Sequence, residues 1–338
     1  MNIRDIAKLA GVSSTTVSRV INKSGYVKKE TRELIEQLIE NHNYTPSAVA
    51  RSLSKQDTAS IGVIIPDIEN SFFSGVIRGI SVMAEKNNFN LFYFDTNEQP
   101  AIEHRFLQTV KEQRLKGLII TPTSHLDRIT REHLQNLERS GIPVVLVDRD
   151  LQGADFDGVF VANQQGAFDA VHALAREGHR SIAIIAGPET SKPGRDRLKG
   201  YLDAMSANHC EIREDYIKRG DFKVDKGYQL TRDLMSMRQP PTAIFSSNNS
   251  MTLGSLKYLF EANYQLGKDV ALIGFDEIEA LNYVGFQLSV VRRAVSEMGT
   301  AAMQILLERL EKSRGKGDVK RIVYPTQLIL KGSEKKLL

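Results

Sequence analysis

Apolar residues in the first 45 positions recur at helical spacing. They fall every three or four positions in three stretches, residues 3–10, 14–21 and 29–41, which predicts three short amphipathic helices. Asn2 and Ser13 stand where the N-caps of the first two helices belong. Two short helices joined by a turn that contains glycine are typical of a helix-turn-helix unit. We therefore predict an all-α N-terminal headpiece over residues 1–45.

Residues 46–59 show a weaker pattern. Pro46 suits the first turn of a helix, and Val49, Ala50 and Leu53 give a narrow apolar face. A helix of about eight residues is not stable alone in water. We predict a hinge that becomes helical only when it docks on another surface.

Beyond residue 60 the pattern changes to short apolar runs that alternate with amphipathic helical stretches. The runs include "SIGVIIPDI", "FNLFYFDT", "GLIITPT", "PVVLVDR", "GVFVAN", "SIAIIAG", "TAIFSSN" and "VALIGFD". This alternation predicts an α/β core in which helices cover both faces of parallel sheets. Because the core spans residues 60–338, we expect two lobes rather than one sheet.

Charge changes this picture only at the N-terminus. The 338 residues carry a net charge of +4, and residues 1–60 account for +3 of it, with nine lysines and arginines against six acids. Most of the excess positive charge therefore lies in the first sixth of the chain, which would attract a polyanion. The overall composition, 41% hydrophobic and 25% charged, is ordinary for a soluble globular protein.

Motifs of enzymes and metal proteins do not appear. The stretch "GPETSKPGRDRLKG" fits neither a phosphate-binding loop nor a dinucleotide-binding loop, and the histidines form no H-E-x-x-H. We expect no catalytic residues, no metal and no cofactor. Cys210 is the single cysteine, so no intrachain disulfide forms. Without a signal-peptide pattern or an apolar run of membrane-spanning length, we expect a cytoplasmic protein that contacts no membrane.

Longer stretches resemble one family of regulators. "IRDIAKLAGVSSTTVSRVIN" and "GYVKKETRELIEQLIENHNYTPSAVARSL" resemble the DNA-binding headpiece of the lactose/galactose repressor family. Core segments such as "IGVIIPDIENSFFSGVIRGI", "PVVLVDRD", "GRDRLKGY" and "LIGFDEIE" are similar to its effector-binding core, which in turn resembles periplasmic sugar-binding proteins. The resemblance implies lobe one at residues 60–162 and 292–322, and lobe two at 163–291 and 323–338.

The resemblance also implies which residues touch double-stranded operator DNA. Ser14, Thr15 and Arg19 would face base edges, and Ser13, Thr16, Ser18 and Asn22 would hold phosphates. Tyr44, Ser47 and Ala50 are further implied contacts, and Leu53 would wedge into the minor groove. Small hydroxyl-bearing side chains and one arginine fit a helix that lies in the major groove. A small surface helix without a DNA partner is the alternative.

For the core, the resemblance implies a pocket for a small sugar-like effector. Its predicted residues are Asn70, Phe72, Phe73, Thr121, Asp148, Arg149, Arg195, Arg197, Phe222, Asn248, Asp276 and Arg293. Most of them follow predicted strands, where open α/β sheets bind ligands. Aromatic rings suit the C–H faces of a sugar and carboxylates suit its hydroxyls. Ordinary core packing is the alternative for the two phenylalanines, and a surface or interlobe ion pair is the alternative for Arg149.

Two segments of the core depart from the family pattern. Ala162 and Asn163 replace its usual Asp-Asn pair, and Arg293 and Ala294 replace its usual glutamine and proline. An arginine that enters a closed site needs a negative partner. Either Arg293 pairs with an acid of the protein, or the effector is a sugar acid or sugar phosphate held by Arg293 and Arg197.

Together these features predict a sequence-specific transcriptional regulator, most simply a repressor, whose operator affinity a small effector controls. It would act as a homodimer, since a two-fold protein reads two half-sites. The rival interpretations are a sugar-binding receptor or transport protein without DNA function, and a sugar-modifying enzyme. The identity of the effector, and whether it releases or promotes DNA binding, stay open.

Overall fold

The computed structural model describes residues 1–22, 24–42, 44, 59–311 and 318–336. The chain divides into two compact units, Met1–Thr58 and Ala59–Leu338. The predicted hinge at 46–59, with Ser47, Ala50 and Leu53, lies outside the described residues except for its last position.

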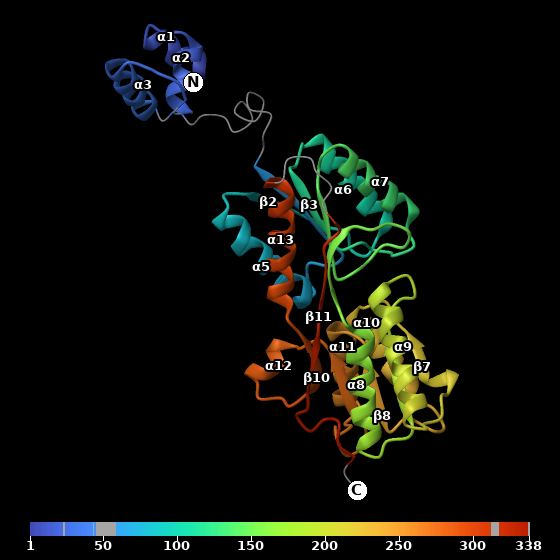
Figure 1. Cartoon of the computed structure of the whole chain (residues 1–338). Helices are drawn as coiled ribbons and strands as arrows, with labels where there is room; N and C mark the ends of the chain where they lie inside the picture. The colour runs from blue at the N-terminus through green and yellow to red at the C-terminus, as the bar shows by residue number, and fades with distance from the viewer. Residues whose placement is uncertain (23, 43, 45–58, 312–317, 337–338) are drawn as a thin grey trace. The chain divides into compact units, whose positions relative to one another are not determined.

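In its described residues, the first unit contains the three helices predicted for the headpiece (Figure 1). Its helices are α1 (Ile3–Leu9), α2 (Ser14–Ile21) and α3 (Lys29–Asn41). The small core contains the predicted apolar stripes, buried at Ile6, Ala7, Val17, Val20 and Ile35. Both predicted N-caps are confirmed: Asn2 Oδ1 accepts from the amides of Arg4 and Asp5, and Ser13 Oγ accepts from that of Thr16. Local pattern and capping therefore suffice to define this unit.

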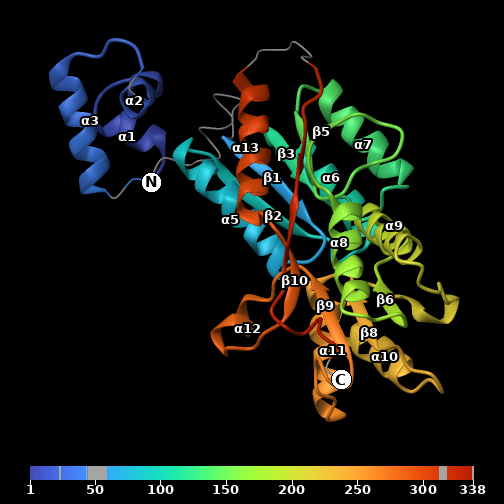
Figure 2. The same ribbon diagram turned by 60° about the horizontal axis from the view of Figure 1, so that its bottom comes forward.

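The second unit contains two lobes, each with a six-stranded sheet between helices (Figures 1 and 2). The strands of lobe one follow the order β11-β5-β4-β3-β1-β2, all parallel. They are β1 (Ser60–Ile65), β2 (Asn90–Asp95), β3 (Gly117–Ile120), β4 (Val144–Val147), β5 (Asp157–Val161) and β11 (Arg321–Tyr324). The helices are α5 (Ser71–Lys86) and α13 (Val295–Glu311) on one face, and α6 (Pro100–Glu112) and α7 (Arg128–Arg139) on the other.

Lobe two repeats this plan with the strand order β12-β10-β9-β8-β6-β7, in which only β12 is antiparallel to its neighbour. The strands are β6 (Ile182–Ala186), β7 (Ile217–Arg219), β8 (Ala243–Ser246), β9 (Ala271–Phe275), β10 (Ser289–Arg293) and β12 (Thr326–Ile329). Helices α8 (Asn163–Arg176) and α9 (Lys192–Ala207) cover one face, and α10 (Val224–Met235) and α11 (Asn249–Glu261) the other. A 3₁₀ turn (Glu214–Tyr216) and the short α12 (Glu279–Tyr283) complete the lobe.

The central strands are buried along their whole length, as β1, β3, β4, β6, β8 and β9 show. Because helices cover both faces of each sheet, neither face is exposed to solvent. The sequences of these strands are therefore continuous apolar runs rather than alternating apolar and polar residues. The predicted α/β core with two parallel-sheet lobes is confirmed.

Within the described residues, the chain crosses between the lobes three times, and two of these crossings lie two residues later than the sequence implies. Arg293 still pairs with Thr326 in the sheet of lobe two, and Tyr324 still pairs with Val161 in the sheet of lobe one. The expected boundaries at 292 and 323 therefore fall inside strands, because ladder pairing continues to the last residue of β10 and of β11. This places Arg293 at the very end of its strand, next to the cleft between the lobes.

Within the part of the chain that the structure describes, no helix is long and apolar enough to span a membrane. Cys210 is a buried free thiol.

Candidate functional site

The two lobes enclose a cavity at the carboxyl ends of their strands. The lining residues are Asp67, Asn70, Phe72, Phe73, Glu98, Asp148, Arg149, Pro193, Arg197, Phe222, Asn248, Asp276 and Arg293. Ten of the twelve residues predicted for the effector pocket are among them. The free space is only about 20 Å³, enough for one or two water molecules. The cavity is therefore a polar site whose own side chains nearly fill it.

Arg293 fills its centre. The guanidinium donates from Nε and Nη2 to the two carboxylate oxygens of Asp276, at 2.5 Å each, and from Nη1 to Asp148 at 2.6 Å. It also lies 3.6 Å over the ring of Phe72. Burial alone would lower the pKa of Arg293, but the two carboxylates outweigh burial and raise it. Of the two alternatives for Arg293, the structure therefore shows pairing with acids of the protein, so this arginine alone gives no reason to expect an anionic effector.

Two further ion pairs border the cavity. Arg149 donates to both carboxylate oxygens of Glu98, at 2.6 and 2.7 Å, inside lobe one. Lys223 of lobe two reaches Asp67 of lobe one at 2.7 Å. Arg149 is thus a lining residue and also one half of an ion pair, but the pair lies within a lobe rather than between lobes or at the surface.

Arg197 has no such partner. It is 2% exposed, donates to Asn163 Oδ1 at 2.9 Å and to the Ser247 carbonyl at 2.6 Å, and stacks 3.8 Å over Phe275. Within the described residues no carboxylate lies at ion-pair distance from it. Burial and the positive charge of Arg293 lower the pKa of Arg197 to about 9. The guanidinium is therefore a buried cation held by neutral acceptors, a costly arrangement that an anion would relieve.

Two predicted pocket residues lie outside the cavity. Thr121 is buried, and its amide donates to the Ile64 carbonyl, which continues the β1–β3 ladder. Arg195 precedes Arg197 by two positions on α9, and residues so spaced do not share a helix face. Its Nη1 lies 2.6 Å from His125 Nε2 at a separate opening.

Sequence reasoning missed Asp67, Glu98 and Pro193 as lining residues. Asp67 follows β1 and Glu98 follows β2, so the rule that pointed to the ends of the later strands would have found both. Pro193 lies in the first turn of α9 and gave no chemical signal of its own.

The headpiece presents the predicted hydroxyl-bearing surface on α2. Thr15 and Arg19 are exposed and Ser14 is half-buried, while Val17 and Val20 face the small core. The four residues expected to hold phosphates form two pairs: Ser13 with Thr16 at 3.0 Å, and Asn22 with Ser18 at 3.1 Å. Tyr44 is half-buried against the same core.

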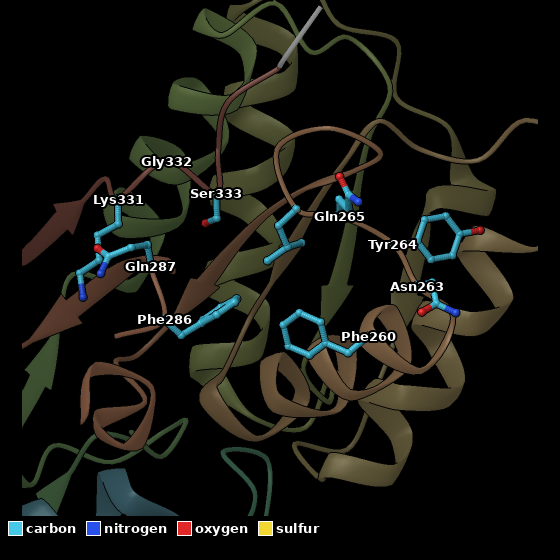
Figure 3. Close-up of a pocket in the computed structure, with 10 residues that line it drawn as sticks. Phe260, Asn263, Tyr264, Gln265, Phe286, Gln287, Lys331, Gly332 and Ser333 are labelled. Carbon is cyan, nitrogen blue, oxygen red and sulfur yellow. The ribbon is translucent and has the colours of Figure 1, made fainter. Parts of the chain in front are cut away.

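A larger hollow of about 620 Å³ lies elsewhere in lobe two (Figure 3). Figure 3 shows Phe260 and Phe286 beside it, with Lys331 at its edge. Lys331 already bonds to Asn282 at 2.7 Å. The hollow lies near the amino ends of β9 and β10, between the segment after α11 and the segment after the antiparallel β12. It is therefore away from the carboxyl ends of the parallel strands, where ligands of such sheets bind. The interlobe cavity is therefore the better candidate, although it is smaller.

Comparison with known proteins settles the family. Residues 58–330 match the model of "Periplasmic binding proteins and sugar binding domain of LacI family", and residues 2–47 match "Bacterial regulatory proteins, lacI family". The chain belongs to the LacI family. It is 31% identical to the probable HTH-type transcriptional repressor ExuR of Bacillus subtilis (strain 168), over 100% of this chain and 99% of that protein.

Solved structures of the LacI family agree with this assignment. A transcriptional regulator CelR–cellobiose complex shares 27% identity and a TM-score of 0.73, over 98% of this chain and 99% of that one. The Lac repressor dimer bound to operator and the anti-inducer ONPF has a TM-score of 0.84 at 24% identity, over 99% of each chain. At 24% identity, the likeness to the Lac repressor structure shows that the two chains share a fold.

Proposed function

We propose that this LacI-family protein is a transcriptional repressor that acts in the cytoplasm as a homodimer on operator DNA. The observation that carries the proposal is the joining, in one chain, of a family headpiece to a two-lobed core with a polar cavity at its strand ends. A receptor or transport protein would have no use for the headpiece. Effector binding between the lobes would change how they close and, through the segment that follows the headpiece, the affinity for DNA.

A gel-shift titration on DNA from upstream of the chain's own gene tests the regulator. We expect a saturable complex with a specific fragment that survives excess unrelated DNA and weakens steeply as salt rises. Equal affinity for all DNA would contradict sequence-specific binding. Loss of the complex on addition of a sugar-like compound would identify an inducer, and strengthening would identify a corepressor.

Arg19 should read a base rather than only a phosphate. It is exposed on α2, and within the described residues no carboxylate pairs with it. We expect Arg19→Ala to cost about 1–3 kcal/mol on the best operator and to relax the preference at one base pair. Competition gel shifts with singly substituted operators measure this. Arg4→Ala, which removes an exposed charge from α1, is the control and should weaken all sequences alike; the same uniform loss for Arg19→Ala would assign Arg19 to phosphate.

The effector proposed for the cavity is a sugar-like molecule with one anionic group, a sugar acid or sugar phosphate. The support comes from Arg197, a buried cation without a carboxylate partner in the described residues, which suits a carboxylate or phosphate. Asp148 and Asp276 can accept hydrogen bonds from hydroxyls, and Phe72 and Phe222 can pack against the C–H faces of the ring.

Calorimetry with a sugar acid and its neutral counterpart tests this assignment. We expect Arg197→Gln to weaken binding of the sugar acid by about 1.5–3 kcal/mol, the strength of a charged hydrogen bond. Binding of the neutral sugar should change much less. Arg195→Gln removes a charge from the same helix but outside the cavity and is the matched control. Tighter binding of the neutral sugar to the unaltered protein would show that the effector is uncharged.

A further inference from the structure

Each lobe supplies one aspartate to Arg293, from equivalent positions. Asp148 follows β4, and its amide donates to the Val159 carbonyl of β5; Asp276 follows β9, and its amide donates to Val291 of β10, at 2.9 Å in both cases. Both aspartates have positive φ, 64° and 75°. Non-glycine residues rarely adopt this conformation, and it persists where the surroundings demand it. The backbone of each lobe is thus shaped to aim a carboxylate at the cleft.

The guanidinium between these carboxylates has the contacts expected of a ligand. It donates hydrogen bonds to carboxylates of both lobes and lies over the Phe72 ring, 3.6 Å from the ring centroid. Arg293 belongs to lobe two, while Asp148 and Phe72 belong to lobe one. The side chain therefore links the lobes at the place where a sugar ring would otherwise stack on an aromatic face and donate hydroxyls to carboxylates.

The remaining space supports the same interpretation. About 20 Å³ is free in the cavity, far less than a drug-sized ligand needs. A sugar-like molecule can enter only if Arg293 withdraws or the lobes part. Either movement breaks the bond from Arg293 Nη1 to Asp148.

We infer that Arg293 is a built-in ligand of the effector site, which holds the lobes together in the effector-free protein and competes with the effector for Asp148 and Asp276. The inference rests on the proposed function only in naming the cavity as the effector site. It follows that an effector must bring its own donors, such as hydroxyl groups, to both carboxylates. Its apparent affinity is reduced by the small fraction of molecules in which Arg293 has withdrawn.

Chemical rescue of the full-length Arg293→Ala variant tests the inference. Methylguanidinium reproduces the missing group and should bind between the two carboxylates. We expect millimolar methylguanidinium to raise the Tm of Arg293→Ala and not that of the unaltered protein. Arg292→Ala is the matched control, because the neighbouring arginine pairs with Glu277 at 2.9 Å outside the cavity. An equal response of all three proteins would overturn the inference.

Hydrogen exchange reports directly on the tie between the lobes. The amide of His125 in lobe one donates to the Thr190 carbonyl in lobe two at 2.9 Å, so its exchange requires the lobes to separate locally. We expect about tenfold faster exchange in Arg293→Ala, reversed by methylguanidinium, and no change in Arg292→Ala. Unchanged protection in Arg293→Ala would show that other contacts hold the lobes.

A second variant covers the case in which Arg293→Ala does not fold. Combining Arg293→Met with Asp148→Asn and Asp276→Asn removes the cation and both anions together, which buried sites often tolerate. We expect fast exchange at His125 and no response to methylguanidinium; slow exchange would overturn the inference. These measurements use no effector and no DNA, so failure to find a sugar-like effector would count against the proposed function and leave the role of Arg293 intact.

Discussion

Gly79→Ala should destabilise the core by about 3 kcal/mol, near the upper end of the usual cost of overpacking. Gly79 on α5 faces α13, and a Cβ there would come 2.0 Å from the Ser296 carbonyl oxygen and 2.9 Å from the Thr300 amide nitrogen. Gly299 on α13 faces back, with the carbonyl of Val76 2.0 Å from the position of a Cβ. Neither obstacle is a side chain that can rotate away, so the helices must move apart over the core of lobe one.

Urea unfolding of Gly79→Ala beside Gly75→Ala provides the measurement and its control. A Cβ at Gly75, one turn earlier on α5, would meet only the side chain of Val295, at 2.8 Å. That methyl group can shift, and alanine is the better helix former by about 0.5–1 kcal/mol. We expect a nearly unchanged urea midpoint for Gly75→Ala. Similar losses for both variants would show that the α5–α13 contact has no special tightness.

Most of the fold could be predicted from the sequence because its signals are local. The stripes that place Ile6, Val17 and Ile35 inward require only helical periodicity, and the caps at Asn2 and Ser13 lie one residue before their helices. Likewise, central parallel strands are apolar throughout. The crossings at β10 and β11 lie two residues later than the sequence predicts, because the end of a strand depends on its partner strand, which can be distant in the sequence.

The site was predictable as a set of positions but not as a set of contacts. Residues after strands gather at one edge, and that rule brings Asp148, Asn248 and Asp276 together. It does not show which side of α9 faces the cavity, so the sequence predicts both Arg195 and Arg197 as lining residues. Nor does it show that Arg293 pairs with an aspartate 145 positions away, because such a contact depends on how far the lobes close.

Asp276→Ala should strongly destabilise the core, because it removes one carboxylate from a buried ion pair. Asp276 is 5% exposed and takes two hydrogen bonds from Arg293. Removal of one partner of a buried ion pair typically costs about 3–5 kcal/mol, because the other charge stays buried. Since Asp148 still pairs with Arg293, we expect the free energy of unfolding to fall by about 3 kcal/mol, the lower end of that range. Urea unfolding measures this change. Asp67→Ala breaks another interlobe pair, but Lys223 is 37% exposed there, so this control should cost about 1 kcal/mol or less.

The double variant Asp276→Ala with Arg293→Ala separates the burial of an unpaired charge from a general loss of packing. If burying Arg293 destabilises the protein only when the Asp276 carboxylate is missing, the two substitutions should not be additive. The double variant should then lose less free energy of unfolding than the sum of the two single variants, with a coupling of about 1–3 kcal/mol. Asp148 would then be the remaining buried charge, so we do not expect full recovery. Losses that simply add would mean that Asp276 and Arg293 stabilise the core independently, and the short bonds between them would then contribute little to holding it.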